Sequence, residues 1–138
     1  MNIKIEDLVT RSMITTQPHA TIGHVKGMLK DNKIQSIPIV DKDKKVLGIA
    51  TVSDVLGMKD TTPISKVMSE SVYTVPLYSD ISTAARVMRN HHIHHVLVTH
   101  EQETIGVLSA YDLLRLVEDH RFVMKNAPTP AKKKAQRQ

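Results

Sequence analysis

The sequence of 138 residues contains no cysteine and no tryptophan, and its other aromatic residues are three tyrosines and one phenylalanine. The lack of cysteine excludes disulfide frameworks, thiolate zinc sites and cysteine nucleophiles. So few aromatic side chains leave little material for stacking nucleic-acid bases. No run of 18 apolar residues is present, so we expect no membrane span. The amino-terminal sequence also lacks the apolar region of a secretory signal, and we expect a cytoplasmic protein.

Motifs for catalysis are also scarce. Only five glycines are present, and the sequence contains neither a Gly-rich phosphate loop nor a G-x-S-x-G motif. The paired acids Asp41/Asp43 and Glu101/Glu103 stand where hairpin turns are expected, and acids in such turns are usually solvated. The sequence therefore predicts a protein that is not an enzyme.

The formal net charge of +5 comes mainly from the carboxyl end. Four of the 19 basic residues lie in the last thirteen residues, which contain no acid, so residues 1–125 carry 15 basic and 14 acidic residues. Residues 125–138 also contain two prolines and no strongly apolar residue, which predicts a disordered basic tail. Binding to nucleic acid is expected from this tail or not at all, and the tail's other candidate partners are an acidic protein or an anionic lipid.

The two halves of the chain resemble each other at an offset of 59 residues. Residues 5–22 align with residues 64–81, and after a one-residue deletion residues 47–56 align with residues 105–114. An internal repeat determines the fold class before any single element is assigned. We expect two repeats, at residues 1–60 and 61–124, with the identical pairs Ile5/Ile64, Ser12/Ser71, Thr15/Thr74 and Ile22/Ile81.

Both repeats show the same predicted order of elements, β-α-β-β-α. Apolar residues at helical spacing predict a helix after each of the N-caps Thr21 and Asp80, and β-branched runs around a charged turn predict a hairpin. One repeat alone has too little core to be stable, so we expect an α/β (α+β) fold with the repeats packed sheet to sheet about a pseudo-twofold axis. The predicted helices begin at residues 22, 53, 81 and 110, the last ending near residue 123, and the hairpin strands are residues 37–40, 46–51, 95–98 and 104–108.

Residues 34–41, IQSIPIVD, contain an apolar-Pro-apolar-apolar-Asp run, and Gly48–Asp54 and Gly106–Asp112 share the pattern Gly-apolar-x-Thr/Ser-x-x-Asp. These three segments resemble the CBS domain family, in which the second pattern is the signature. The resemblance covers about residues 5 to 124 and implies a tandem CBS pair, or Bateman module. It further implies binding of AMP, ADP, ATP or S-adenosylmethionine in clefts between the repeats, usually to regulate a partner.

Each copy of the signature has a hydroxyl and an acid where a helix begins. Thr51 and Ser109 can hold a phosphate together with backbone N–H groups, and Asp54 and Asp112 can accept hydrogen bonds from both ribose hydroxyls. The alternative is that these four residues only cap the helices. The resemblance places the adenine slot at Ile14, Thr16, Pro18, Ala20, Val75, Leu77, Ile34 and Ile93, and the other candidates beside it are Ile37, Pro38, Ser53 and Tyr111.

Five of the eight histidines lie within residues 91–100. The resemblance aligns His94 and His95 with a His-Arg pair that some energy-sensing members use to contact ligand phosphates. Because His95 replaces the arginine, we expect phosphate binding to be strongest below about pH 6.5. A metal site and an exposed polar turn are the alternatives. A strand through this segment would place His92 and His94 on one face and His95 on the other, which disfavours a metal, and we expect no metal cofactor.

The predicted function is that of a regulatory module that senses an adenosine ligand. No effector domain is apparent in the sequence, so we expect the module to act on a separate client protein. The last helix is more apolar than one small sheet requires, which together with the resemblance favours a homodimer. The alternative for these apolar residues is that they close the core within one chain, and both can hold. The alternative function is a histidine-based metal-binding protein, or a purely structural protein with empty clefts. The apolar residues that favour dimerisation are Leu113, Leu114, Leu116, Val117 and Val123.

Overall fold

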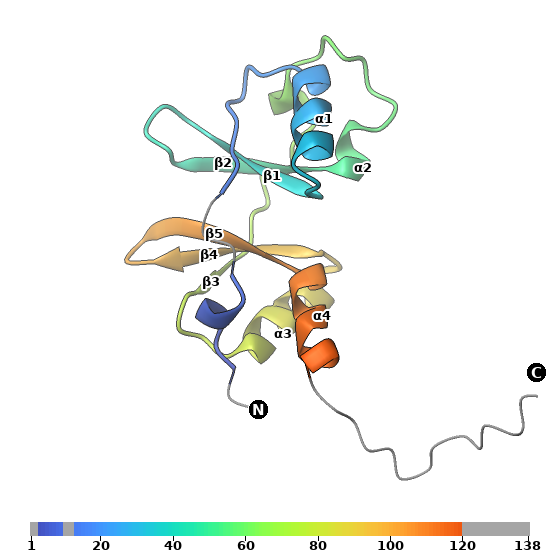
Figure 1. Ribbon diagram of the computed structural model, residues 1–138. Helices are drawn as coiled ribbons and strands as arrows, with labels where there is room; N and C mark the ends of the chain where they lie inside the picture. Colours follow the sequence, from blue (N-terminus) through green and yellow to red (C-terminus); the bar gives the residue numbers. More distant parts are fainter. Residues whose placement is uncertain (1–2, 10–12, 120–138) are drawn as a thin grey trace, which may run out of the picture.

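A computed structural model describes residues 3–9 and 13–119 of the chain. Two small sheets face each other, and the helices cover their outer surfaces (Figure 1). The predicted α+β fold of two repeats packed sheet to sheet is therefore confirmed. The tail predicted at residues 125–138 lies outside the described residues.

The first repeat contains helix α1 (Ile22–Asp31), strands β1 (Ser36–Val40) and β2 (Val46–Thr51), and the short helix α2 (Val52–Val55). Thr21 caps α1 as predicted, because its Oγ1 accepts a hydrogen bond from the N–H of His24 at 3.3 Å. β1 and β2 form the predicted antiparallel hairpin. The strand predicted before α1 is reduced to a single parallel bridge between Thr16 and Ile39, because the chain turns at residues 17–20 immediately afterwards.

The second repeat contains strand β3 (Thr74–Pro76), helix α3 (Ile81–His91), strands β4 (His95–His100) and β5 (Glu103–Ser109), and helix α4 (Ala110–Asp119). β3 pairs in parallel with β4, and β4 pairs antiparallel with β5. The described part of α4 ends at residue 119, and residues 120–123 of the predicted helix lie outside it.

Asp80 does not cap α3 as predicted. It occupies the N-cap position, but its side chain makes no capping hydrogen bond and pairs with the Nζ of Lys4 instead. This ion pair holds the pKa of Asp80 below its usual value, mainly through the hydrogen bond from Lys4. The amino-terminal segment is thereby attached to the second repeat.

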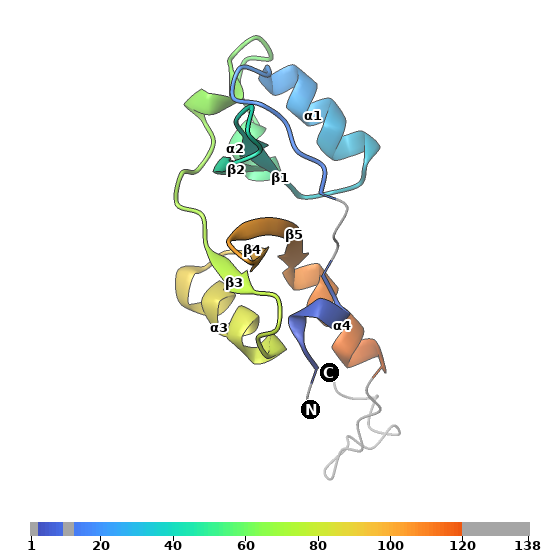
Figure 2. The same cartoon turned by 90° about the vertical axis from the view of Figure 1, so that its left-hand side faces the viewer.

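Each repeat begins with a 3-10 turn, at Ile5–Asp7 and Ile64–Lys66, that packs on the other repeat. The N–H of Ile5 donates to Ser79 O at 3.0 Å, and the N–H of Ile64 donates to Ala20 O at 2.7 Å. Figure 2 shows the first turn against the lower sheet and the second against the upper one. Each packing unit, meaning one sheet with its helices and core, therefore differs from a sequence repeat. It contains the first turn of the other repeat in place of its own.

Because the first turns are exchanged between the repeats, each of the two hydrophobic cores contains residues of both repeats. One lies under β1 and β2 and contains Ile22, Val25, Leu29, Ile37, Ile39, Ala50, Val55 and Ile64. The other lies under β3, β4 and β5 and contains Ile5, Leu8, Val75, Leu77, Ile81, Ala84, Met88, Val96, Val98 and Leu108. Burial of a large aliphatic side chain contributes about 1.5–3 kcal/mol, so the exchanged isoleucines bind the two units together.

Candidate functional site

A cleft of about 730 Å³ opens between the two sheets. Its walls are the end of β2 with α2, the linker at residues 69–73, the turn and strand at residues 92–97, and the junction of β5 with α4. Both copies of the signature therefore border the same cleft, with Thr51, Ser53 and Asp54 on one side and Ser109 and Tyr111 on the other.

The acids of the signature form capping boxes with the hydroxyl residues. Asp54 Oδ2 accepts the N–H of Thr51 at 2.9 Å, and Thr51 Oγ1 accepts the N–H of Asp54 at 3.4 Å. Asp112 Oδ2 accepts the N–H of Ser109 at 2.8 Å and its hydroxyl at 3.1 Å. The predicted helix-capping role is thus confirmed for both pairs. In each carboxylate the hydrogen bonds found among the described residues use Oδ2, which leaves Oδ1 for other donors.

The two acids differ in their access to the cleft. Asp54 lines it, whereas Asp112 lies behind Ser109, which lines it. Thr51 Oγ1 also lies 3.1 Å from Ser53 Oγ, so two hydroxyls stand next to Asp54. The wall formed by the first repeat is therefore rich in oxygen atoms.

The linker wall of the cleft depends on Gly48. Ile49 and Ser69 exchange both backbone hydrogen bonds at 2.9 Å, which brings the linker directly over β2. A Cβ on Gly48 would lie 2.7 Å from Ser69 O and 2.9 Å from Met68 Sδ. The signature glycine is thus required for this close approach of two backbones, and the approach positions Ser69 at the cleft.

The histidine-rich segment turns sharply before it enters the sheet. His92 ends α3 in the left-handed conformation at φ 55°, and β4 begins only at His95. The prediction that His92 and His94 share a strand face is therefore wrong, because neither residue lies in the strand. Instead, His92, His94 and His95 all line the cleft.

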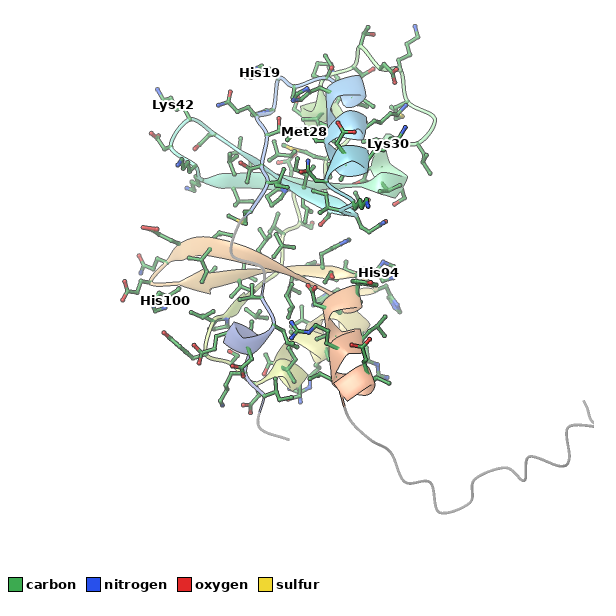
Figure 3. All side chains as sticks on the ribbon, in the orientation of Figure 1. His19, Met28, Lys30, Lys42, His94 and His100 are labelled. Atoms are coloured by element: carbon green, nitrogen blue, oxygen red, sulfur yellow. The ribbon has the colours of Figure 1, made fainter. Side chains whose placement is uncertain are left out.

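The other two histidines of the segment have different environments. The ring of His91 stacks on that of Tyr73, with centroids 4.0 Å apart. His100 lies at the far end of β4 and meets Tyr78 edge to face at 5.4 Å. Figure 3 shows His94 and His100 at opposite ends of the lower sheet. Residues 91–100 therefore do not form one cluster in space.

His95 is half-buried at the start of β4, where it pairs with Ser109 of β5. Burial lowers the pKa of His95 below its ordinary value of 6.5. The neighbouring His94 lowers this pKa further, and Asp112 opposes the shift. The rings of His94 and His95 stand nearly perpendicular, with centroids 6.3 Å apart.

No group of three or more histidine and acidic side chains is arranged for metal binding within residues 3–9 and 13–119.

Several residues predicted for the adenine slot lie away from this cleft. Ile37, Val75 and Leu77 are buried in the two cores, and Ile14, Ala20 and Ile34 pack against the first core. Thr16 exchanges backbone hydrogen bonds with Pro38 and Val40 of β1, and the carbonyl of Pro18 accepts the N–H of Ser65. Pro38 lies within β1 opposite Ile49. Of the predicted slot residues, only Ile93 lines the cleft.

The linker provides lining residues that the sequence analysis missed: Ser69, Ser71, Val72 and Tyr73. The internal repeat contained a signal for one of them, because the offset of 59 residues maps Tyr73 onto the candidate Ile14. The residues equivalent to 69–71 are 10–12, which lie outside the described residues. The cleft described above is thus the one bordered by the linker of the second repeat.

Comparison with known families explains this arrangement of two signatures around a shared cleft. Residues 5–59 and 64–119 each match the CBS domain. The chain belongs to the CBS domain family. The family assignment made from the signature residues is thereby confirmed.

Two solved CBS structures resemble this pair closely in fold. The CBS domain pair of protein MJ0100, in complex with 5′-methylthioadenosine and S-adenosyl-L-methionine, has a TM-score of 0.80 and 23% sequence identity, covering 86% of this chain and 98% of that chain. A CBS domain protein from Pyrobaculum aerophilum complexed with AMP has a TM-score of 0.75 and 26% identity, covering 84% of this chain and 99% of that chain.

The similarity to enzymes is confined to part of their length. Inosine-5′-monophosphate dehydrogenase of Methanocaldococcus jannaschii is 26% identical over 114 residues, which are 81% of this chain and 23% of the enzyme. A second curated relative from the same organism is matched over 32% of its length. The CBS pair thus spans about a quarter to a third of these relatives.

Within the described residues, no helix has the length and apolar character needed to cross a membrane.

Proposed function

We propose that this CBS pair is a regulatory module that binds an adenosine-containing ligand in the cleft between its repeats. The observation that carries the proposal is that both signature segments, the linker and the turn before β4 converge on one cleft of about 730 Å³. That volume is within the range of small-molecule sites. The AMP and S-adenosylmethionine complexes of similar CBS proteins support this class of ligand.

The proposed contacts follow from the polarity of the walls. The ring of Tyr73 and the side chains of Val72 and Ile93 provide the apolar surface that a base requires. Asp54, which lines the cleft, accepts hydrogen bonds from the ribose hydroxyls through Oδ1, since Oδ2 is held in the capping box. Asp112 lies behind Ser109 and holds that residue at the cleft wall. Thr51 and Ser109 contact the 5′ group. The ligand candidates are AMP, ADP, ATP and S-adenosylmethionine.

The proposed partners are a second copy of the chain and a client protein that responds to the bound ligand. Exposed apolar side chains lie on α4, where Tyr111 is 77% exposed and Leu114 is 56% exposed. Another lies just after α2, where Leu56 is 67% exposed. Single exposed apolar residues are common, but Tyr111 and Leu114 lie on one helix and Leu56 borders the same cleft as Tyr111, which favours an interface. Leu56 and Tyr111 also line the cleft, so contacts made here would sense its occupancy.

Calorimetric titration with AMP, ADP, ATP and S-adenosylmethionine tests the proposal. We expect at least one of them to bind, and we expect Asp54→Ala to weaken that ligand by about 1.5–3 kcal/mol through loss of charge-assisted hydrogen bonds. Asp80→Ala is the matched control, because Asp80 also stands at a helix start but pairs with Lys4 outside the cleft. Wild-type affinity in Asp54→Ala would contradict the ribose assignment.

A further inference from the structure

A groove of about 380 Å³ lies between α1 and α2 of the first repeat. Its floor is apolar and includes the buried side chains of Leu29 and Val55. Its rim carries lysines on and just after α1, and Figure 3 shows Lys30 on the side of α1 that faces α2. The described lining contains no acidic residue, so its formal charge is three positive. The lysines are Lys26, Lys30 and Lys33.

The second repeat has an equivalent groove with a different charge. The offset of 59 residues places Ala85, Arg89 and His92 where the first repeat has its three lysines, and all three line the second groove. Of these, only Arg89 is charged at every ordinary pH. Residues 1–125 contain nearly equal numbers of basic and acidic residues. The three lysines are therefore a local excess of charge at one groove and not a property of the whole surface.

The lysines form a row along the groove. Lys26 and Lys30 are one helical turn apart, about 6 Å along the axis, and Lys33 follows directly after the helix. Lys26 Nζ pairs with Asp60 at 2.9 Å, whereas Lys30 and Lys33 have no ion-pair partner among the described residues. A row of this kind matches acids that are one turn apart on a second helix. It does not match a single small anion, which would need converging donors.

Two other occupants match the groove less well. In a second copy, the exposed side of α4 carries both Arg115 and Glu118, so these residues bring no net negative charge to the lysines. A membrane surface is bound by apolar side chains that protrude between basic ones. Within the described lining, Leu56 is the only apolar residue that is exposed. The recessed floor instead suits a side chain inserted from a partner protein.

We propose that this groove, hereafter the lysine groove, docks an amphipathic helix of the client protein whose apolar face is flanked by acidic residues. Apolar side chains of that helix pack over Leu29 and Val55, and its acids face Lys30 and Lys33. This is the mode in which amphipathic helices bind grooves, with anchors one turn apart. The inference rests on the proposed regulatory function for the existence of a client, and it names the surface that the client contacts.

The lysine groove and the ligand cleft have a common wall. Gln35, Val52 and Leu56 line both of them. The N–H of Val52 donates to Gln35 O at 3.1 Å, and the single turn of α2 that follows also carries Asp54. A ligand held by Asp54 therefore fixes the helix that forms one side of the groove. We expect the bound ligand to strengthen docking of the client.

The test lets the protein select the chemistry of its partner. A displayed library of amphipathic helical peptides, with leucines on one face and randomised residues beside them, is selected on the full chain. We expect acidic residues to be enriched beside the leucines. The affinity of the best peptide is then measured by fluorescence polarisation. Lys30→Glu/Lys33→Glu should weaken it by about tenfold or more, because attraction becomes repulsion, and added salt should weaken the wild-type complex.

A matched control makes the same charge change elsewhere. Lys42→Glu/Lys44→Glu lies in the turn between β1 and β2 and should keep wild-type affinity. Selection on Lys30→Glu/Lys33→Glu should enrich basic residues instead, and thermal melts show that both double variants are folded. Absence of enriched peptides, enrichment of neutral or basic ones on wild type, or equal losses in the two double variants overturns the proposal.

Two further outcomes would assign the lysine groove to another occupant. If Lys30→Glu/Lys33→Glu alone converts a dimer into a monomer, a second copy fills the groove. If wild type binds vesicles containing phosphatidylserine and this variant does not, the groove meets a membrane. Either result overturns docking of a client helix.

Addition of AMP or S-adenosylmethionine separates this inference from the proposed function. A bound ligand should tighten the selected peptide by about fivefold, and the peptide should tighten the ligand by the same factor. If calorimetry shows that a ligand binds but the affinity of the peptide does not change, the coupling through α2 is overturned. If the peptide binds in the lysine groove and neither ligand binds, the proposed adenosine site fails while the docking surface stands.

Discussion

Ile5 and Ile64 occupy equivalent positions in the two sequence repeats, and each is completely buried in the core of the opposite repeat. The exchange is reinforced by backbone hydrogen bonds from Ile5 to Ser79 and from Ile64 to Ala20. Neither repeat can therefore complete its core without a residue from the other. The cleft between the sheets is held in place by this mutual dependence.

Truncation of either isoleucine should destabilise the whole molecule. Ile5→Ala and Ile64→Ala are each expected to reduce the free energy of unfolding by about 2–5 kcal/mol, because the side chain is removed from a closed core. Chemical denaturation should show one cooperative transition in wild type and in both variants. Leu114→Ala, at a side chain that is 56% exposed, serves as the control. Two separate transitions in Ile5→Ala would show that the repeats fold independently.

Substitution of Gly48 should damage both stability and ligand binding. Gly48→Ala places a Cβ 2.7 Å from Ser69 O, so the linker must move away from β2. We expect a loss of about 1–3 kcal/mol in the free energy of unfolding, typical of overpacking, and weaker binding of the adenosine ligand.

Gly27→Ala is the matched control for Gly48→Ala. Gly27 lies within α1, and an added Cβ there would have no neighbour within 4 Å. It should stabilise the protein by about 0.5–1 kcal/mol, because alanine is the better helix former. Equal effects of the two substitutions on stability would rule out the proposed backbone contact at Gly48.

The stability of the unliganded protein should rise with pH through the histidine range. The folded state lowers the pKa of His95, so below the ordinary value of 6.5 the unfolded chain binds more protons than the folded one. Acid therefore removes stability as pH falls through that range. Thermal melts at pH 5.5 and pH 8 should differ less for His95→Gln than for wild type. If the difference in melting temperature between the two pH values is unchanged in His95→Gln but reduced in His100→Gln, the effect arises at the opposite end of β4. The assignment to His95 would then be wrong.

Binding of AMP should be accompanied by proton uptake near pH 7. A phosphate beside His94 and His95 favours their charged forms, so protons pass from buffer to protein when the complex forms. Titrations in two buffers with different ionisation enthalpies measure the number of protons taken up. We expect uptake of up to about one proton in wild type and close to zero in His94→Gln/His95→Gln. Equal heats in both buffers for the wild-type protein would argue against contact between the phosphate and the histidines.

The exposed apolar surface of α4 should control self-association. Leu114→Glu/Val117→Glu places two charges on a face where both side chains are 56% exposed. Analytical ultracentrifugation should show a dimer for wild type and a monomer for this variant, because a charge that is buried without a partner is costly. Lys42→Glu, in the turn between β1 and β2, is the control. A wild-type monomer at all concentrations would remove the second copy from the proposed partners.

The fold and its family were predictable from local patterns. Apolar periodicity located α1 and α3, the offset of 59 residues showed the duplication, and the two Gly-to-Asp segments identified the CBS signature. Capping could be predicted at Thr21, where the side chain acts on its own helix. The prediction of a cap failed at Asp80, because Lys4, 76 residues away in the chain, binds the carboxylate that would otherwise accept a hydrogen bond from the helix backbone.

The cleft was only partly predictable. The signature residues Thr51, Ser53, Asp54, Ser109 and Tyr111 follow from a local motif, and they line the cleft. Periodicity shows that Val75 and Leu77 alternate on one face of a strand, but it does not show whether that face meets the cleft or the core.

Only the packing of the two repeats determined which residues meet. It turned Val75 and Leu77 into the core, brought Tyr73 and Ser69 to the cleft wall, and exchanged Ile5 and Ile64 between the units. Local patterns depend on neighbours within a few positions, and they specify helices, turns and caps. A cleft depends on contacts between residues far apart in the chain, whose positions are set when the cores of both repeats close.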